Sequence, residues 1–124
     1  MTITLFLLVI TCVIISVLAQ VAMKIGMSGP LVQASLASGV YAEAIAIVLR
    51  NPLVVGGLAA YMLGAALWLF VLSKADLSLV YPFVSFGFIL TMLFGWLFLH
   101  EHVGYFRAFG TLLIAVGAYL VARS

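Results

Sequence analysis

The sequence predicts an all-α membrane protein with four transmembrane helices and a short interfacial helix between the first and the second. Of its 124 residues, 68% are hydrophobic and only 6% are charged, whereas a soluble domain carries about 25% charge. The apolar residues form four runs, each close to the roughly 20 helical residues that cross a hydrocarbon core of about 30 Å. These runs lack the alternation of a membrane β-barrel. The composition therefore excludes a soluble enzyme and a nucleic-acid-binding protein.

We expect one domain over residues 1–124. The first span carries no charge, and it lacks the basic n-region of a signal peptide, so we interpret it as a retained helix. The second begins at Asn51-Pro52, a helix start signal. The four predicted spans cover residues 3–23, 52–72, 77–99 and 106–122.

The third and fourth spans each follow a polar turn. Asp76 or Ser78 caps the third helix, and Pro82 then falls in its first turn, where proline is tolerated. His100-Glu101-His102 precedes the fourth span. We expect Glu101 to cap that helix or to pair with Arg107, and we do not expect a metal site, because residues two apart do not share a helix face.

The connector over residues 28–50 is the only long connection between spans. Gly29-Pro30 ends the first helix. Apolar and polar residues then alternate loosely, which favours a short amphipathic helix over 40–49 at the membrane interface. A plain connector is the alternative.

Basic residues do not fix the orientation in the membrane. With four spans, both termini share one side with Lys74 and Arg123, and the other side holds Lys24, Arg50 and Arg107. This near balance gives no clear result under the positive-inside rule. It is compatible with an antiparallel dimer.

Polar residues in the first span recur every four positions and share one helical face, along Cys12, Ser16, Gln20 and Lys24. Placing a polar group in lipid costs free energy, so polar residues inside a span indicate functional sites. We therefore expect Ser16, Gln20 and Lys24 to bind substrate along a polar path. The alternative is structural, with Gln20 bonded to a neighbouring helix and Lys24 reaching the headgroups.

The second span offers both candidate binding residues and a candidate packing surface. Tyr61 and Trp68 lie seven residues apart and share a face, so both are candidates for substrate binding, although Trp68 also suits an interfacial anchor. Gly56, Ala60 and Gly64 form a ridge of small residues suited to close helix packing.

In the third span, Tyr81 and Ser85 are the polar members of an apolar face that also holds Phe88 and Met92. We expect Tyr81 and Ser85 to face an internal cavity, with contact to another helix as the alternative. The sequence shows no catalytic constellation and no cofactor-binding motif.

No carboxylate lies inside a predicted span. Glu43, Asp76 and Glu101 all fall at or outside the span boundaries. An exporter that exchanges protons for cationic drugs needs an intramembrane acid. The polar residues present suit a polar or anionic headgroup better than a lipophilic cation.

These motifs resemble the drug/metabolite transporter superfamily in its four-helix, small-multidrug-resistance-like form. The segment Ala19-Gln-Val-Ala-Met-Lys24 is similar to the end of the family's first helix, and Phe98-Leu99-His100-Glu101 to the turn before its last helix. Gly110-Thr-Leu-Leu-Ile-Ala-Val-Gly117 resembles the segment through which small multidrug resistance proteins dimerise. The resemblance implies that Gly110 and Gly117 let fourth helices approach each other.

One departure separates this chain from the drug exporters. When Lys24 is aligned with the family lysine, Ser16 occupies the position of the proton-coupling glutamate. The long connector, Tyr61-x-x-Gly64…Trp68 and Lys74-Ala-Asp-Leu-Ser-Leu-Val-Tyr-Pro82 are instead similar to the paired small subunits of aminoarabinose flippases.

The resemblance implies a multi-pass protein of the bacterial inner membrane, active as a homodimer or with a similar small subunit. Its implied activity is the flipping of a polyprenyl-phosphate-linked sugar, such as undecaprenyl-phosphate aminoarabinose, toward lipid A modification. Two alternatives stay open: a small-metabolite or drug exporter of the same superfamily, and a non-transporting accessory subunit of a membrane glycosyltransferase complex. We expect membrane lipid and the lipid-linked sugar as partners, and no nucleic acid or cofactor.

Overall fold

The computed structural model describes residues 2–124, and its regular structure is entirely helical. Four helical stretches are long and apolar enough to cross a membrane: Ile3–Met27, Pro52–Leu72, Leu77–Leu97 and Tyr105–Arg123. The predicted fold class is therefore confirmed. The elements in order are α1 (Ile3–Met27), α2 (Pro30–Ala37), α3 (Tyr41–Arg50), α4 (Pro52–Leu72), α5 (Leu77–Val80), the 3₁₀ segment η1 (Tyr81–Val84), α6 (Ser85–Leu97) and α7 (Tyr105–Arg123).

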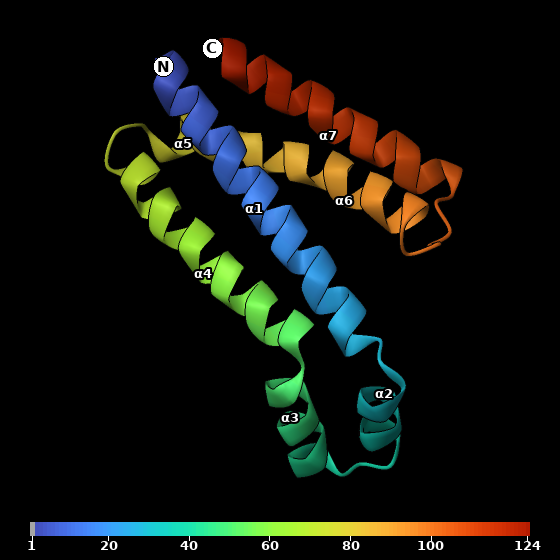
Figure 1. Cartoon of the computed structure of the whole chain (residues 1–124). Helices are drawn as coiled ribbons and strands as arrows, with labels where there is room; N and C mark the ends of the chain where they lie inside the picture. The colour runs from blue at the N-terminus through green and yellow to red at the C-terminus, as the bar shows by residue number, and fades with distance from the viewer. Residues whose placement is uncertain (1) are drawn as a thin grey trace.

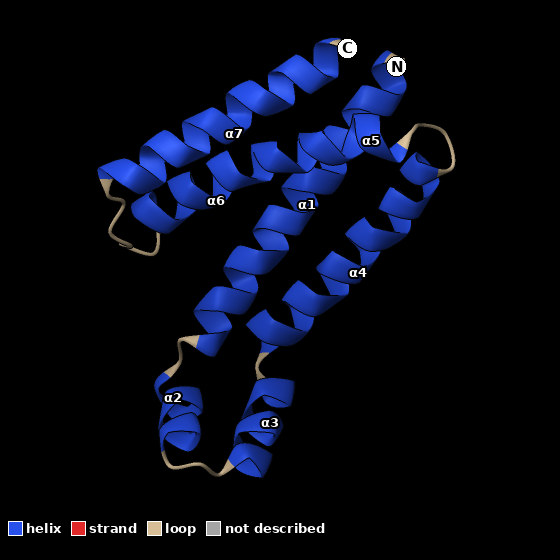
Figure 2. Ribbon diagram, turned by 180° about the vertical axis from the view of Figure 1, so that it is seen from behind, coloured by secondary structure: helices blue, strands red, loops and turns tan. Residues whose placement is uncertain are grey.

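The spans form two helix pairs (Figures 1 and 2). Helices α1 and α4 run side by side, and α6 and α7 form the second pair. The pairs meet near the chain termini, which lie at the same end of the molecule, and they diverge toward the other end. Helices α2 and α3 extend beyond the far end of the α1–α4 pair.

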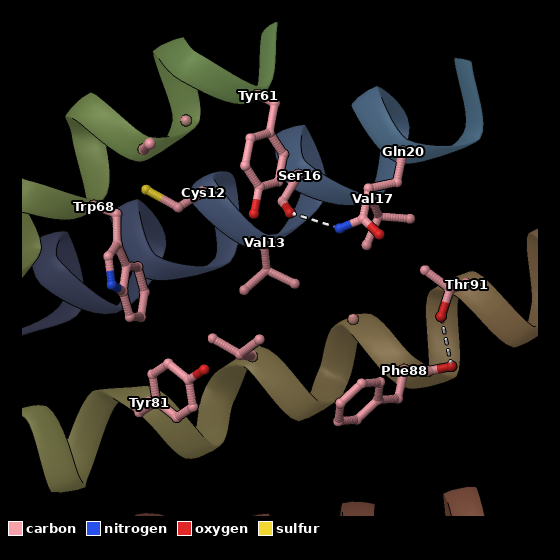
Figure 3. Close-up of a pocket in the computed structure, with 14 residues that line it drawn as sticks. Cys12, Val13, Ser16, Val17, Gln20, Tyr61, Trp68, Tyr81, Phe88 and Thr91 are labelled. Atoms are coloured by element: carbon pink, nitrogen blue, oxygen red, sulfur yellow. Dashed lines mark hydrogen bonds between the residues drawn. The ribbon is translucent and has the colours of Figure 1, made fainter. Parts of the chain in front are cut away.

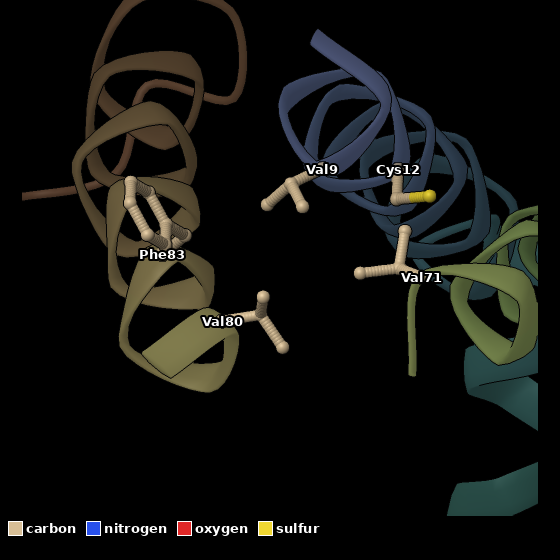
Figure 4. Close-up of a cluster of buried hydrophobic side chains, with 5 residues drawn as sticks. All are labelled: Val9, Cys12, Val71, Val80 and Phe83. Carbon is tan, nitrogen blue, oxygen red and sulfur yellow. The ribbon is translucent and has the colours of Figure 1, made fainter. Parts of the chain in front are cut away.

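Buried side chains hold the two pairs together where they meet (Figure 4). Val9, Cys12, Val71, Val80 and Phe83 form this cluster, and Val9, Val71 and Val80 are fully buried. The ring of Phe6 also packs edge-on against Phe83, with centroids 5.8 Å apart. Many other large apolar side chains are exposed in the single chain. Such a surface is covered by lipid or by another chain.

Helix α1 is longer than expected, because it continues past residue 23 to Met27. The hydroxyl of Thr2 caps its start by accepting a bond of 3.2 Å from the backbone N–H of Leu5. Lys24 lies in the last turn, where a cation interacts favourably with the helix dipole. The charge of Lys24 therefore does not end the helix, which stops at Ser28, before Gly29 and Pro30.

Two glycines of α4, Gly57 and Gly64, make its closest approach to α1. A Cβ on Gly57 would lie 2.7 Å from Cγ of Met23, and one on Gly64 would lie 3.2 Å from a side-chain atom of Ile15. Gly56 instead faces open space, and Ala60 is half-buried. Gly57 and Gly64, two turns apart, therefore face α1. The packing of the Gly56, Ala60 and Gly64 ridge against another helix or chain stays a prediction.

The connector holds two short helices instead of one. Helix α3 is the predicted amphipathic helix, with the exposed residues Tyr41, Ile45 and Leu49 spaced four apart. Helix α2 was not predicted; Pro30 begins it, and Val32 and Ser35 are buried. The position of α3 at the membrane interface stays a prediction.

The third span is interrupted near its start. Asp76 occupies the N-cap position of α5, but its side chain forms no capping hydrogen bond. After one turn the backbone tightens into η1, which contains Pro82, and then continues as α6. Proline lacks the backbone N–H that an α-helix uses at this position. Our expectation that Pro82 sits in the first turn of a continuous helix was therefore wrong.

The turn between α6 and α7 also differs from expectation. The carboxylate of Glu101 packs against Gly95, where a Cβ would lie 2.5 Å from its oxygen, and the N-cap residue of α7 is Gly104, with no side-chain capping bond. Arg107 donates a 2.9 Å hydrogen bond to the backbone oxygen of His102. Glu101 thus neither caps α7 nor holds Arg107, because the turn folds its side chain back onto α6.

Helix α7 is the least covered span. In the apolar 18-residue stretch of α7 only 6% of the residues are buried, whereas 28% are buried in the corresponding stretch of α1. Gly110 and Gly117 face open space, with no atom within 4 Å of a Cβ built on either. The expected packing of fourth helices against each other stays a prediction.

Candidate functional site

A cavity of about 420 Å³ lies between the first three spans (Figure 3). Its walls mix apolar, aromatic and neutral polar side chains. The lining residues are Cys12, Val13, Ser16, Val17, Gln20, Tyr61, Gly64, Ala65, Trp68, Tyr81, Val84, Gly87, Phe88 and Thr91.

Helix α1 supplies three members of the predicted polar stripe, Cys12, Ser16 and Gln20. Their four-residue spacing places them on one face over about two turns. The side-chain amide of Gln20 donates a 3.2 Å hydrogen bond to the Ser16 hydroxyl. This bond links two polar groups in the cavity wall and leaves the amide oxygen of Gln20 available.

Lys24 continues the stripe but does not line the cavity. It lies one turn beyond Gln20, about 6 Å along the helix axis, and its side chain is exposed. Lys24 thus lies in the last turn of α1, the end of that helix at which the two helix pairs diverge.

Helix α4, which lies beside α1, brings both Tyr61 and Trp68 to the cavity, as their spacing predicts. Gly64 lies between them along the helix and also contacts Ile15 of α1. Because glycine has no side chain, it brings α4 close to α1 and leaves room between the two rings. In Figure 3 the hydroxyl of Tyr61 points toward Ser16.

The third span contributes Tyr81, Phe88 and Thr91, but Ser85 does not line the cavity. Ser85 is buried, and its hydroxyl donates to the backbone oxygen of Pro82. The reason is the 3₁₀ segment, in which each residue turns about 120° instead of about 100°. Over the four residues from Tyr81, this adds about 80° and turns Ser85 away from the face of Tyr81.

Thr91 is the polar lining residue that sequence reasoning did not select, and Phe88, which was placed on the face of Tyr81, also lines the cavity. Thr91 donates a 3.1 Å hydrogen bond to the backbone oxygen of Phe88. Thr91 and Ser85 are the two hydroxyl-bearing residues of α6, and Thr91 lies three residues after Phe88. The three-residue spacing between Phe88 and Thr91 could have indicated that they share a helix face. Placing Thr91 on the same side as Tyr81 also requires the change of register at η1.

None of the cavity-lining residues carries a formal charge. The polar groups are hydroxyls, one amide, a thiol and an indole N–H, which can bind by hydrogen bonding without a charged partner. Within residues 2–124, the histidines, acids and cysteine form no group of three that would hold a metal ion. The site therefore suits non-covalent binding of a neutral polar group.

Comparison with known proteins gives two relatives of one kind. The chain is 36% identical over 73 residues to the probable 4-amino-4-deoxy-L-arabinose-phosphoundecaprenol flippase subunit ArnE of Aeromonas hydrophila. It is 32% identical over 73 residues to the protein of the same name from Aeromonas salmonicida. Each match covers 59% of this chain and 64% of the relative.

No family model and no solved structure matches the chain. The relatives are described as subunits of a flippase, a transporter of lipids across a membrane, and not as enzymes. The predicted resemblance is thus confirmed at this level: over 59% of its length, the chain is similar to probable aminoarabinose-phosphoundecaprenol flippase subunits of bacteria.

Proposed function

We propose that this protein is a transporter subunit that flips a polyprenyl-phosphate-linked sugar, such as undecaprenyl-phosphate aminoarabinose, across the bacterial inner membrane. The observation that carries the proposal is the uncharged cavity between three spans, whose apolar and aromatic walls carry several hydrogen-bonding groups, with Lys24 one turn beyond Gln20. The similarity to flippase subunits supports the same substrate class. No step of this function requires a catalytic residue or a cofactor.

The cavity lets a polar headgroup cross the membrane while the lipid tail stays outside. Hydroxyl and amide groups along Ser16, Gln20, Tyr61 and Tyr81 replace water around the headgroup. This replacement matters because an unpaired polar group in hydrocarbon costs several kcal/mol. Lys24 attracts the phosphate by its charge. The polyprenyl tail, which is apolar, remains in the bilayer throughout.

A partner subunit completes the protein in this proposal. Almost all of helix α7 is exposed in the single chain. Its Gly110 and Gly117 allow a second helix to approach closely. The relatives are named as subunits. A second copy or a similar small subunit therefore packs on α7, and the first three spans of both protomers face a shared path.

The test is flipping of a labelled polyprenyl-phosphate sugar by the purified protein in liposomes. The double variant Gln20→Ala, Lys24→Ala removes the amide of the cavity and the nearby charge. Thr11→Ala is the matched control, because Thr11 lies on α1 outside the cavity and bonds the backbone oxygen of Leu7 at 2.8 Å. We expect the double variant to lose flipping and Thr11→Ala to keep it; equal flipping by all three proteins would contradict the site.

An accessory role is the second candidate, and the exposure of α7 favours it. In that case α7 would bind a larger membrane glycosyltransferase or transporter. Fixed-stoichiometry co-purification with such a protein, together with no flipping by the small chain or its dimer, would support this role and contradict the transporter.

A further inference from the structure

Several hydrogen-bonding groups of the cavity have no side-chain hydrogen-bond partner within residues 2–124. Between the lining residues, the hydrogen bonds are those from Gln20 to Ser16 and from Thr91 to the Phe88 carbonyl (Figure 3). The hydroxyls of Tyr61 and Tyr81 and the indole N–H of Trp68 have no partner in that set. A ligand with several hydroxyls, each of which donates and accepts, matches these groups.

The cavity also offers aromatic faces that no other ring covers. The aromatic ring pairs within residues 2–124 join Phe6, Phe83, Phe86, Phe94 and Phe98, and none of these lines the cavity. Tyr61, Trp68, Tyr81 and Phe88 thus present unstacked rings to it. Such amphipathic rings bind ligands that have one apolar face and one polar edge. A sugar ring has this character, with C–H groups on its faces and hydroxyls at its edge.

A phosphate fits the same cavity badly. None of its lining residues is basic. Moving an ionised group out of water without a countercharge costs several kcal/mol. The nearest cation along α1 is Lys24, which is exposed and lies about 6 Å further along the axis than Gln20.

From these observations we infer that, in the conformation of this structure, the cavity receives the glycosyl unit of the lipid and not its phosphate, which stays at the level of Lys24 until the transfer step. This inference rests on the proposed function and deepens it. Its consequence is selectivity: the site recognises the sugar-loaded lipid and rejects the bare polyprenyl phosphate, which brings charge but no hydroxyls to Tyr61, Trp68 and Tyr81.

Cys12 provides a native reporter of occupancy. It is the chain's only cysteine, and it lines the cavity. The rate at which a small thiol reagent modifies Cys12 can be measured in lipid nanodiscs by intact-protein mass spectrometry. A ligand in the cavity slows the reaction. The matched control is Ile14→Cys in a Cys12→Ser background, since Ile14 is exposed on α1 and does not line the cavity.

The probes are farnesyl phosphate, farnesyl-phosphoryl glucose and farnesyl-phosphoryl 4-amino-4-deoxyarabinose. We expect at least one glycoside to slow Cys12 modification by about tenfold at a concentration that fills 90% of the sites. Farnesyl phosphate should leave the rate unchanged, and no probe should protect the cysteine at position 14. In Lys24→Gln, a higher glycoside concentration should be needed for the same protection.

Equal protection by farnesyl phosphate and the glycosides would overturn the inference, because phosphate would then enter the cavity. Lack of protection by both glycosides, in protein that flips lipid-linked sugar, would also overturn it. Protection by a glycoside in protein that shows no flipping would support the cavity's selectivity and contradict the proposed function. These outcomes therefore distinguish a failure of the cavity's selectivity from a failure of the proposed flippase function.

Discussion

The side-chain amide of Asn51 donates a 3.2 Å hydrogen bond to the backbone oxygen of Gly26 and so joins the start of α4 to the end of α1. The same side chain caps α4, since its oxygen accepts a 3.0 Å bond from the backbone N–H of Leu53. Gly26 is buried here, and a Cβ on it would lie 2.5 Å from a methyl carbon of Val54. One asparagine thus fixes where α2 and α3 leave the two spans.

Replacing Asn51 tests this double role. Asn51→Ala should lower the free energy of unfolding by about 1–2 kcal/mol, because it removes a helix cap worth about 1 and an interhelical bond worth about 0.6. Asn51→Asp keeps the capping oxygen and removes the donor, so it should lose less. Thermal unfolding in detergent micelles measures both. Equal stability of the alanine variant and wild type would contradict the role.

Gly57 and Gly56 form a matched pair for the α1–α4 contact. Gly57→Ala should destabilise by about 1–3 kcal/mol, as overpacking does, because its Cβ would lie 2.7 Å from Cγ of Met23 and 2.9 Å from the backbone oxygen of Ala19. Gly56→Ala meets no atom within 4 Å and should not destabilise the single chain; the higher helix propensity of alanine adds up to about 1 kcal/mol. Denaturation in sodium dodecyl sulfate compares the two. The opposite ranking would show that the register of α4 against α1 is different.

His100 adopts a left-handed backbone conformation, with φ of 56°. The turn there is closed by a 2.9 Å bond from the N–H of Glu101 to the oxygen of Gly95. Glycine adopts this conformation without the cost of roughly 1–2 kcal/mol that a side chain incurs, although it gives up some chain entropy. His100→Gly should therefore stabilise the protein by about 0.5–1 kcal/mol.

The control for that variant is His102→Gly. His102 has no positive φ, and its backbone oxygen, which accepts from Arg107, is kept by glycine. We expect no gain in stability there. A rise in melting temperature for His102→Gly but not for His100→Gly would contradict the assignment of strain.

Ser16 and Ser85 test the cavity itself, since only Ser16 lines it. Ser16→Ala removes the hydroxyl that positions Gln20, and it should slow flipping by about tenfold, the effect of losing about 1.4 kcal/mol of binding. Ser85→Ala removes a bond to Pro82 within its own helix and should leave the flipping rate unchanged. Initial rates in liposomes compare the two. A stronger effect at Ser85 would show that the third span has another register.

Much of this arrangement could be predicted from the sequence. The apolar runs located the four spans, and Asn51-Pro52 marked the first residue of α4 correctly. Helical periodicity also brought Ser16 and Gln20 together, and Tyr61 and Trp68 to one wall, because those helices are regular over the residues concerned.

The remainder depended on features that periodicity does not contain. The 3₁₀ segment at Tyr81–Val84 changes the register of the third span, which exchanges Ser85 for Thr91 in the cavity wall. Which glycine of α4 meets α1 depends on packing between the helices, and so Gly57 was not distinguished from Gly56. Helix α2 carries no strong apolar stripe, so the periodicity of the sequence did not predict it. In the structure it packs against α3.

The most direct test of the central claim is photolabelling with a farnesyl-phosphoryl sugar that carries a diazirine on the sugar ring. After irradiation in nanodiscs, mass spectrometry identifies the labelled residues. We predict adducts on cavity residues of α1, α4 and α6, foremost Gln20, Tyr61 and Thr91, with labelling reduced by excess unlabelled glycoside. Labelling confined to α7, or labelling at the cavity that excess glycoside does not reduce, would contradict the account.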